Sequence, residues 1–271
     1  MTKSFLWSDM PPAMVSDWHA NSYHQRFRAI FESLVMVDLW RLRQTQSNHD
    51  SAEFKVDWRS SFLAIATTCA TGQGLTAQPW AEDLQRIANQ SREALLLAVL
   101  PILLLHSNPY GHQRQTLQRW GEAMGLDHPR ILDLDSSFQR LCLAMETPPP
   151  WDPSLQPDPV QDQATGTGAV LEPVQILVTA SQGQFLPALQ LAHHLHSSAV
   201  TLSLVGVLVA WYGGLTALPS HLRHDCLRSP YLARHWRDNY SHRLSQLADG
   251  LYRGWVGTQP GCHQPSGLVV L

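Results

Sequence analysis

The residues of this chain that are most suggestive of chemistry are two aspartates separated by one residue. Asp133 and Asp135 follow the apolar pair Ile131-Leu132, and this spacing is typical of phosphatases that use an aspartate as the nucleophile. Such enzymes also need a lysine further along the chain. Lys55 is the last lysine of the sequence, so the pattern does not predict a phosphatase. A cap of the helix that is expected to follow is the simpler role for Asp135.

A second candidate site is the histidine cluster His193, His194 and His196. Imidazole is a good ligand for transition metals, so neighbouring histidines suggest a metal centre. On a helix, however, these positions do not share one face, and no two of them have i,i+4 spacing. The pattern therefore favours histidines that are solvated or that line a pocket.

Other kinds of catalysis lack the residues that they need. Lys3 and Lys55 are the only lysines, which leaves almost none for Schiff-base chemistry or a phosphate-binding loop. The sequence contains no Gly-x-Ser-x-Gly and no His-Glu-x-x-His motif. The cysteines form no paired spacing typical of a zinc site and are expected to be reduced thiols; they are Cys69, Cys142, Cys226 and Cys262.

The net charge of -3 creates no overall field that would attract nucleic acid or anionic lipid. Segment 221–243 is a local exception, with five arginines and four histidines against two aspartates. Trp236 and Tyr240 in this segment could stack on bases. An amphipathic helix with a solvated basic face explains the same pattern and is favoured. We therefore expect no nucleic-acid partner.

Apolar periodicity predicts helices through most of the chain. The expected helices are residues 23–43, 61–71, 80–105, 114–124, 136–145 and 232–252. Segment 174–180 fits a short strand or the start of a helix, and convincing alternating strands are scarce, so the expected fold class is all-α. With 271 residues and 44% hydrophobic content the chain can bury a full core. We assign to this core Phe27, Leu34, Leu63, Leu97, Val99, Leu208 and Trp211.

The composition changes abruptly between residues 147 and 173, which are rich in proline and carry four acidic residues and no basic ones. Such a segment cannot bury a core and is predicted to be a flexible loop. The predicted organisation is an N-terminal arm over residues 1–20 and one helical domain over residues 21–271. The arm lacks the apolar core of a signal peptide, which favours a cytoplasmic location.

Residues 199–218 are uncharged over a length that could cross a bilayer. Their glycines and hydroxyl side chains fit either a membrane helix or a central helix surrounded by others. The soluble character of the neighbouring segments favours the buried helix. We therefore expect no membrane span, and a membrane-associated helical protein is the alternative.

The same region carries a resemblance to a known family. The run from Gly206 to Pro219 resembles the Gly-Ala-Leu-Ala-Gly-Ala-Tyr-Tyr-Gly-Leu-Glu-Ala-Ile-Pro segment of ADP-ribosylglycohydrolases. The chain is also similar to this family, in the same order, at residues 26–40, 58–66, 93–101 and 195–200. The resemblance implies an orthogonal helical bundle of the ADP-ribosylglycohydrolase type.

The matched segments have lost the residues that bind metal in that family. Residues 59–61 read Arg-Ser-Ser where the family has the ligands Thr-Asp-Asp. Residues 197–200 read Ser-Ser-Ala-Val where the family has Asp-x-Asp, in either of two registers, and only Asp38 survives from the polar part of the first segment. The resemblance implies a vestigial cleft edged by Asp38, Asp57, Arg59, Ser60, Ser61, His196, Ser197 and Ser198.

Members of this family hold two magnesium or manganese ions, which orient ADP-ribose and a nucleophilic water. A serine is a neutral and weaker ligand, and Arg59 would place a positive charge where the cations belong. The resemblance therefore implies a catalytically silent protein, without catalytic residues, bound metal or another cofactor, that acts in binding, scaffolding or regulation. The expected partner is another protein, and a nucleotide or an ADP-ribose-like molecule is a second candidate ligand.

The alternative within the family is an active hydrolase of ADP-ribosyl N- or O-glycosides with relocated metal ligands. Those ligands would come from Asp38, Asp57, Asp133, Asp135 or the histidine cluster. Simpler roles exist for the first two residues, since Asp38 fits a satisfied core carboxylate and Asp57 fits a cap of the helix that begins near Arg59.

Overall fold

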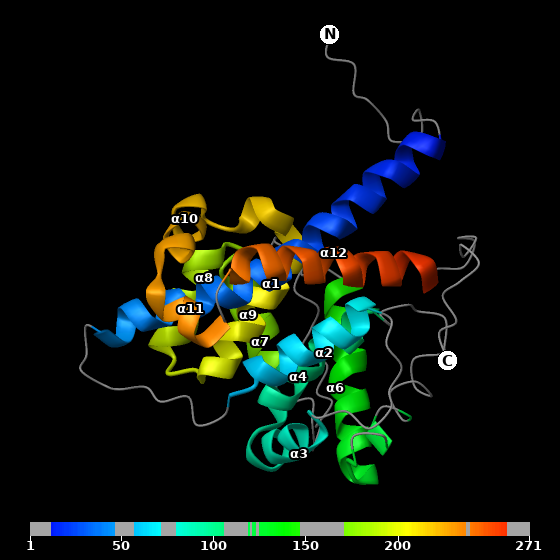
Figure 1. Cartoon of the computed structure of the whole chain (residues 1–271). Helices are drawn as coiled ribbons and strands as arrows, with labels where there is room; N and C mark the ends of the chain where they lie inside the picture. The colour runs from blue at the N-terminus through cyan, green and yellow to red at the C-terminus, as the bar shows by residue number, and fades with distance from the viewer. Residues whose placement is uncertain are drawn as a thin grey trace.

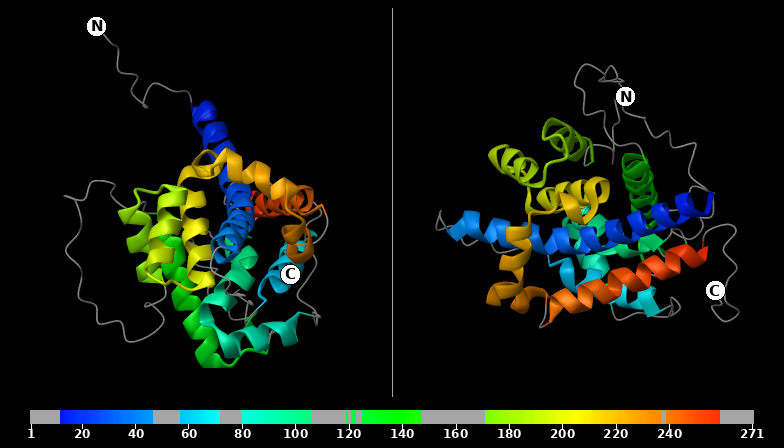
Figure 2. Two further views of the ribbon diagram at one scale, coloured as in Figure 1. Left: turned by 90° about the vertical axis from the view of Figure 1, so that its left-hand side faces the viewer. Right: turned by 90° about the horizontal axis from the view of Figure 1, so that it is seen from above.

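The computed structural model describes residues 12–46, 57–71, 80–105, 119, 121–122, 125–146, 171–236 and 239–258. Every regular element in these ranges is a helix, which confirms the predicted all-α class (Figures 1 and 2). The helices are α1 (Pro12–Gln46), α2 (Arg59–Thr71), α3 (Ala81–Gln90), α4 (Arg92–Leu105), α6 (His128–Glu146), α7 (Leu171–Ala180), α8 (Phe185–His194), α9 (Ala199–Gly213), the 3₁₀ helix η4 (Gly214–Ala217), α10 (Ser220–Arg228), α11 (Pro230–Trp236) and α12 (Tyr240–Thr258).

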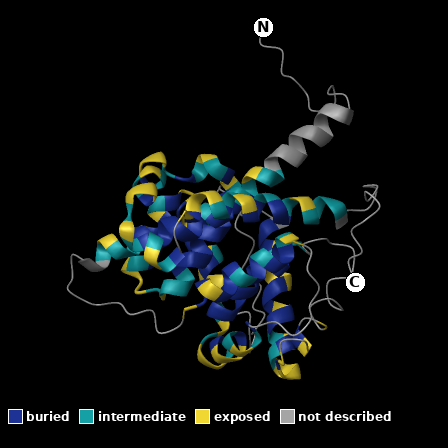
Figure 3. Cartoon of the chain, viewed as in Figure 1, coloured by how far each residue is buried: buried dark blue, intermediate teal, exposed yellow. Residues whose placement is uncertain are grey.

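Helix α9 lies at the centre of this arrangement. It contacts α1, α4, α6, α7 and α8, and its residues from Leu202 to Trp211 are all buried (Figure 3). Together with η4 it is the one helix of the described residues that is long and apolar enough to cross a membrane. A helix that is apolar on all sides suits a core position, and the predicted burial is confirmed for residues 202–211. The residues predicted for the core are also all buried.

Three contacts hold α9 close to α1 and α6. At Gly206 an added Cβ would lie 2.7 Å from Cγ2 of Val37, so glycine allows α1 and α9 to approach closely. Near the C-terminal end of α9, Trp211 Nε1 donates to the carbonyl of Met145 at 2.8 Å, and the Tyr212 hydroxyl donates to that of Ala144 at 2.5 Å. These carbonyls belong to the last turn of α6, where no backbone donor within the helix remains for them.

The prediction of one helix over residues 80–105 is wrong, because the helix is interrupted at Ser91. This residue is extended, with φ -158° and ψ 126°, and its N–H donates to the carbonyl of Ile87 at the end of α3. Its hydroxyl then accepts the N–H of Ala94 at 3.1 Å and caps α4. The single serine thus ends one helix and starts the next.

The helix predicted over residues 136–145 begins earlier than expected. Asp127 caps α6, since its Oδ1 accepts the N–H of Arg130 at 3.0 Å. The predicted cap role of Asp135 is therefore wrong. Asp135 lies in the interior of α6, is buried, and accepts a hydrogen bond from Nε2 of Gln139 at 3.1 Å.

Other predicted boundaries also differ. The helix predicted over residues 232–252 is divided into α11 and α12, with Asn239 at a φ of 57° just before α12. Helix α1 begins at Pro12 and so runs through the predicted boundary between arm and domain; proline suits a first helical turn because no N–H is needed there. Helix α7 includes residues 174–180 and begins at Leu171, inside the predicted loop. Residues 147–170, and most of the helix predicted at 114–124, lie outside the described residues.

Candidate functional site

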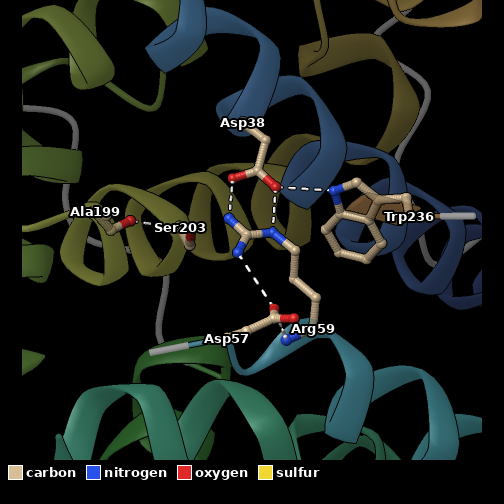
Figure 4. A network of polar contacts seen from close by, with 6 residues as sticks. All are labelled: Asp38, Asp57, Arg59, Ala199, Ser203 and Trp236. Atoms are coloured by element: carbon tan, nitrogen blue, oxygen red, sulfur yellow. Dashed lines mark hydrogen bonds and ion pairs between the residues drawn. The ribbon is translucent and has the colours of Figure 1, made fainter. Parts of the chain in front are cut away.

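A buried ion pair joins α1 to the first residue of α2 (Figure 4). The side chains of Arg59 and Asp38 are 1% and 3% exposed. Nε of Arg59 donates to Oδ2 of Asp38 at 2.5 Å, and Nη2 donates to Oδ1 at 2.6 Å. This two-point contact matches the planar guanidinium to the carboxylate. Asp38 is therefore a satisfied core carboxylate, as predicted.

Two tryptophans enclose the pair. Nε1 of Trp236, at the end of α11, donates to Oδ2 of Asp38 at 2.8 Å. The guanidinium carbon of Arg59 lies 5.0 Å from the ring centre of Trp58 and 5.9 Å from that of Trp236. Cations are attracted to aromatic faces at these distances, so the rings stabilise the guanidinium while they keep water away from it.

The surroundings hold Arg59 in its charged form. Burial opposes the charge, but the Asp38 carboxylate outweighs this effect and the pKa of Arg59 is raised. Asp57 adds a smaller contribution, with Oδ1 at 3.7 Å from Nη1 of Arg59 and in contact with its backbone N–H at 3.2 Å. This second contact confirms the predicted position of Asp57 at the start of α2. Burial lowers the pKa of Arg41, a further guanidinium that interacts with Asp38.

The serines next to Arg59 lie on different sides of α2. Ser60 is exposed, whereas Ser61 is buried and its hydroxyl has no hydrogen-bond partner among the described residues. Ser203 of α9, which Figure 4 draws beside the ion pair, donates to the carbonyl of Ala199 at 3.1 Å. Its hydroxyl is thus satisfied within its own helix.

Residues 196–198 form the joint between α8 and α9. His196 has a φ of 54°, and its N–H donates to the carbonyl of His193, while the N–H of Ser197 donates to that of Ala192. This is the Schellman pattern that ends helices. Ser198 then accepts the N–H of Thr201 at 3.0 Å and caps α9. His196 and Ser197 thus end α8, and Ser198 starts α9.

The histidine cluster does not converge on one point. The ring of His193 packs edge-on against Trp40 with centres 5.6 Å apart, whereas His194 and His196 are exposed. Within the described ranges no group of three His, Cys, Asp or Glu side chains is placed to hold a metal ion. The acidic pair on α6 has other contacts, since Asp133 lies 3.1 Å from Arg92 and Asp135 accepts from Gln139.

The structure therefore brings Asp38, Asp57 and Arg59 together and places residues 196–198 at a helix joint. Sequence reasoning missed the roles of Trp58 and Trp236. The available signal was the position of an aspartate and an arginine within two strongly apolar segments, since buried charges need partners.

Comparison with known proteins does not assign the chain to a family. No protein-family model, no curated protein and no solved structure matches it. The similarity to ADP-ribosylglycohydrolases stays a prediction from the sequence segments described above, and function has to be inferred from the site.

Proposed function

We propose that this protein is a pseudoenzyme of the ADP-ribosylglycohydrolase type, an orthogonal helical bundle that acts by binding another protein as a scaffold or regulator. The observation that carries the proposal is the state of Asp38. The resemblance makes this residue the surviving carboxylate of the first matched segment, yet both of its oxygens accept hydrogen bonds from Arg59. One of them also accepts the indole N–H of Trp236. Little acceptor capacity is left for a divalent cation.

Arg59 supplies the positive charge that a metal ion would otherwise supply. A guanidinium with a raised pKa is charged at every pH at which the protein is folded. A cation placed beside Asp38 would be repelled by Arg59 and by Arg41. Metal-dependent hydrolysis therefore has weak support at this position. The arrangement favours a protein that binds a partner through its surface or its remaining cleft.

The alternative of relocated ligands requires several carboxylates around one ion. Asp38 is already paired with Arg59, and Asp57 lies 3.7 Å from the same guanidinium, which would repel a cation. Asp133 and Asp135 have their contacts on α6 and α4. None of these contacts favours a rebuilt metal site.

A melting experiment tests the metal part of the proposal. Millimolar magnesium or manganese should leave the melting temperature unchanged within about 1 °C, whereas a working micromolar site would add about 4 kcal/mol of stability. An Asp38→Asn variant provides the control, since its response to the cations should equal that of the wild type. A cation-induced rise that Asp38→Asn removes would show that Asp38 binds metal.

An activity assay tests the catalytic part. The wild-type protein, incubated with an ADP-ribosylated protein and manganese, is expected to release no ADP-ribose. Metal-dependent release that Asp38→Asn or Asp57→Asn abolishes would overturn the proposal and favour the hydrolase. Calorimetry with ADP-ribose in the presence of a chelator then asks whether the cleft binds this ligand without metal, and affinity capture from native extract identifies the protein partner.

A further inference from the structure

The amphipathic helix favoured for segment 221–243 is divided among α10, α11 and the first turn of α12. The two aromatic side chains of this segment do not lie on its surface. Trp236 is fully buried and donates to Asp38, and Tyr240 is 7% exposed and donates to the carbonyl of Cys226. Neither ring can therefore stack on a base, and the basic side chains of the segment remain to be explained.

Helix α10, at the upper left of Figure 1, has a sharply divided surface. Leu222 and Cys226 face the core and are 2% and 5% exposed. The opposite side, which we call the outer face of α10, consists of the exposed residues His221, His224, Leu227 and Arg228. The two histidines and the arginine have i, i+3 and i+7 spacing, so they form one stripe along the helix, and the leucine lies beside it.

The acidic side chains beside the outer face are already paired. On one flank of α10, Asp225 accepts a hydrogen bond from Nη2 of Arg43 at 2.8 Å. On the other flank, Nε of Arg223 donates to Oε2 of Glu32 at 2.6 Å. Within the described part of the chain no acidic side chain forms an ion pair with Arg228, so its charge is available to a carboxylate from outside.

The carboxyl group of Asp225 shows which charge this side of α10 favours. The hydrogen bond from Arg43, with a further contribution from the charges of Arg43, His224 and His221, holds the pKa of Asp225 below its ordinary value. The basic side chains around α10 thus stabilise a carboxylate at the edge of the outer face. The same kind of group, supplied by a partner, suits Arg228 one turn further along the helix.

An exposed leucine among these basic residues narrows the class of partner. Leu227 is 63% exposed, and interfaces between proteins combine apolar contacts with a polar rim. A phosphate backbone presents charge without apolar surface, whereas an acidic amphipathic protein segment presents both. The combination of Leu227 with Arg228 therefore favours a protein partner over a nucleic acid.

We propose that the outer face of α10 is the docking surface for an acidic amphipathic segment of a partner protein. One carboxylate of that segment pairs with Arg228, the imidazoles of His221 and His224 donate to further carboxylates, and an apolar side chain packs on Leu227. This inference rests on the proposed function as a protein-binding scaffold or regulator and names the chemistry of the partner. Charge complementarity of this kind determines mainly the choice of partner and the rate of association.

Fluorescence anisotropy with the full chain tests the proposal. The probe is a labelled peptide of four Glu-Glu-Leu-Glu repeats, and two comparison peptides carry glutamine in place of glutamate or alanine in place of leucine. The probe is expected to bind, and each comparison peptide is expected to bind at least about threefold more weakly, because it loses the charged or the apolar contacts. The proposal is overturned if the probe does not bind to millimolar protein, or if either comparison peptide binds as tightly as the probe.

Variants then locate the surface. Arg228→Glu should weaken binding of the probe by about tenfold, since a repulsion replaces an attraction, and Leu227→Gln by about threefold or more. Arg140→Glu is the matched control, because Arg140 is an exposed arginine of α6, away from the outer face of α10. The changed side chains are all exposed, so melting curves of the variants should match that of the wild type. Equal effects of Arg228→Glu and Arg140→Glu would overturn the location.

Other occupants of the outer face would give different results. Tighter binding of oligothymidylate or of phosphatidylserine vesicles than of the probe, with the same loss in Arg228→Glu, would overturn the proposal. Self-association that Leu227→Gln abolishes, measured by sedimentation, would also overturn it, because the occupant would be a second copy of the chain. Affinity capture separates this inference from the proposed function: if the wild type and Arg228→Glu capture the same partner protein equally, the docking surface is wrong while the proposed function stands.

Discussion

Arg59 and Asp38 are each costly to bury alone, because a buried charge loses its hydration. In the pair, the charges cancel and Trp236 satisfies part of the remaining acceptor capacity of Asp38. The pair also fixes the start of α2 against α1. Arg59 stands where the resemblance implies a metal ligand. Its ion pair with Asp38 instead joins α2 to α1.

The ion pair leads to a prediction about stability. Arg59→Leu leaves the Asp38 carboxylate buried without its counter-charge, and should lower the free energy of unfolding by about 3 to 5 kcal/mol. In the double variant Asp38→Leu/Arg59→Leu no charge stays buried, so most of this loss should be recovered. Urea unfolding curves measure both values. A double variant that is no more stable than the single one would contradict this explanation.

His196 allows a second prediction. Its backbone has a φ of 54°, a conformation that glycine adopts without strain at a helix end. His196→Gly should therefore raise the free energy of unfolding by about 0.5 to 1 kcal/mol. Thermal melts of the variant and the wild type give the difference, and a less stable variant would show that the imidazole makes a contact worth more than the strain.

Sequence reasoning reached part of this site. It predicted Asp38 as a core carboxylate and Asp57 at the start of a helix, and both predictions are confirmed. It did not predict the pairing of Arg59, because Arg59 and Asp38 are separated by 21 positions and Trp236 lies 198 positions from Asp38. Residue types along a chain do not reveal such contacts without the packing of the helices.

At the scale of elements, periodicity predicted where helices occur better than where they end. The break at Ser91 was missed because Gln90 and Arg92 on either side are good helix formers. What ends α3 is a change of one backbone conformation that the serine hydroxyl stabilises. The early start of α6 was missed because a cap was assigned to Asp135 rather than to Asp127. Cap residues also occur inside helices, so their type alone does not locate a boundary.

The contact between α1 and α9 gives a prediction at this scale. Gly206→Ala places a methyl group 2.7 Å from Cγ2 of Val37, and the resulting shift of the helices should cost about 1 to 3 kcal/mol. Gly257→Ala in α12 is the control, since an added Cβ there meets nothing within 4 Å. This control should be neutral or slightly stabilising, because alanine favours a helix. Similar losses for both variants would contradict the proposed role of Gly206 in helix packing.

The core of the whole molecule also contains thiols that resist ionisation. Burial raises the pKa of Cys69 to about 12 from an ordinary value of 9.0, since the thiolate would lose its hydration. In the folded protein Cys69 therefore keeps its proton under conditions in which the unfolded chain has lost it. The contribution of the protonated Cys69 thiol to the free energy of unfolding is fully present below pH 9. It is lost as the pH rises toward 12.

This difference is measurable with urea unfolding at pH 8 and pH 10. Over this interval the wild type should lose about 1 kcal/mol more than Cys69→Ala. Equal losses for the wild type and Cys69→Ala would mean that Cys69 ionises freely in the folded state.

Trp211 and Tyr212 contact the last turn of α6, and Leu171 at the start of α7 is buried. These contacts predict how two fragments would behave if the chain were cut between α6 and α7. A cut between residues 155 and 156 gives one fragment with α1 to α6 and another with α7 to α12. The contacts of α9 with α1, α4 and α6 then all run between the fragments. The second fragment cannot cover α9 alone, and the first leaves the surfaces of α1, α4 and α6 that contact α9 uncovered, so each should aggregate when produced separately. Produced together, they should assemble as an obligate heterodimer, which would make this protein suitable as a split reporter whose complementation signals that two fused proteins have met.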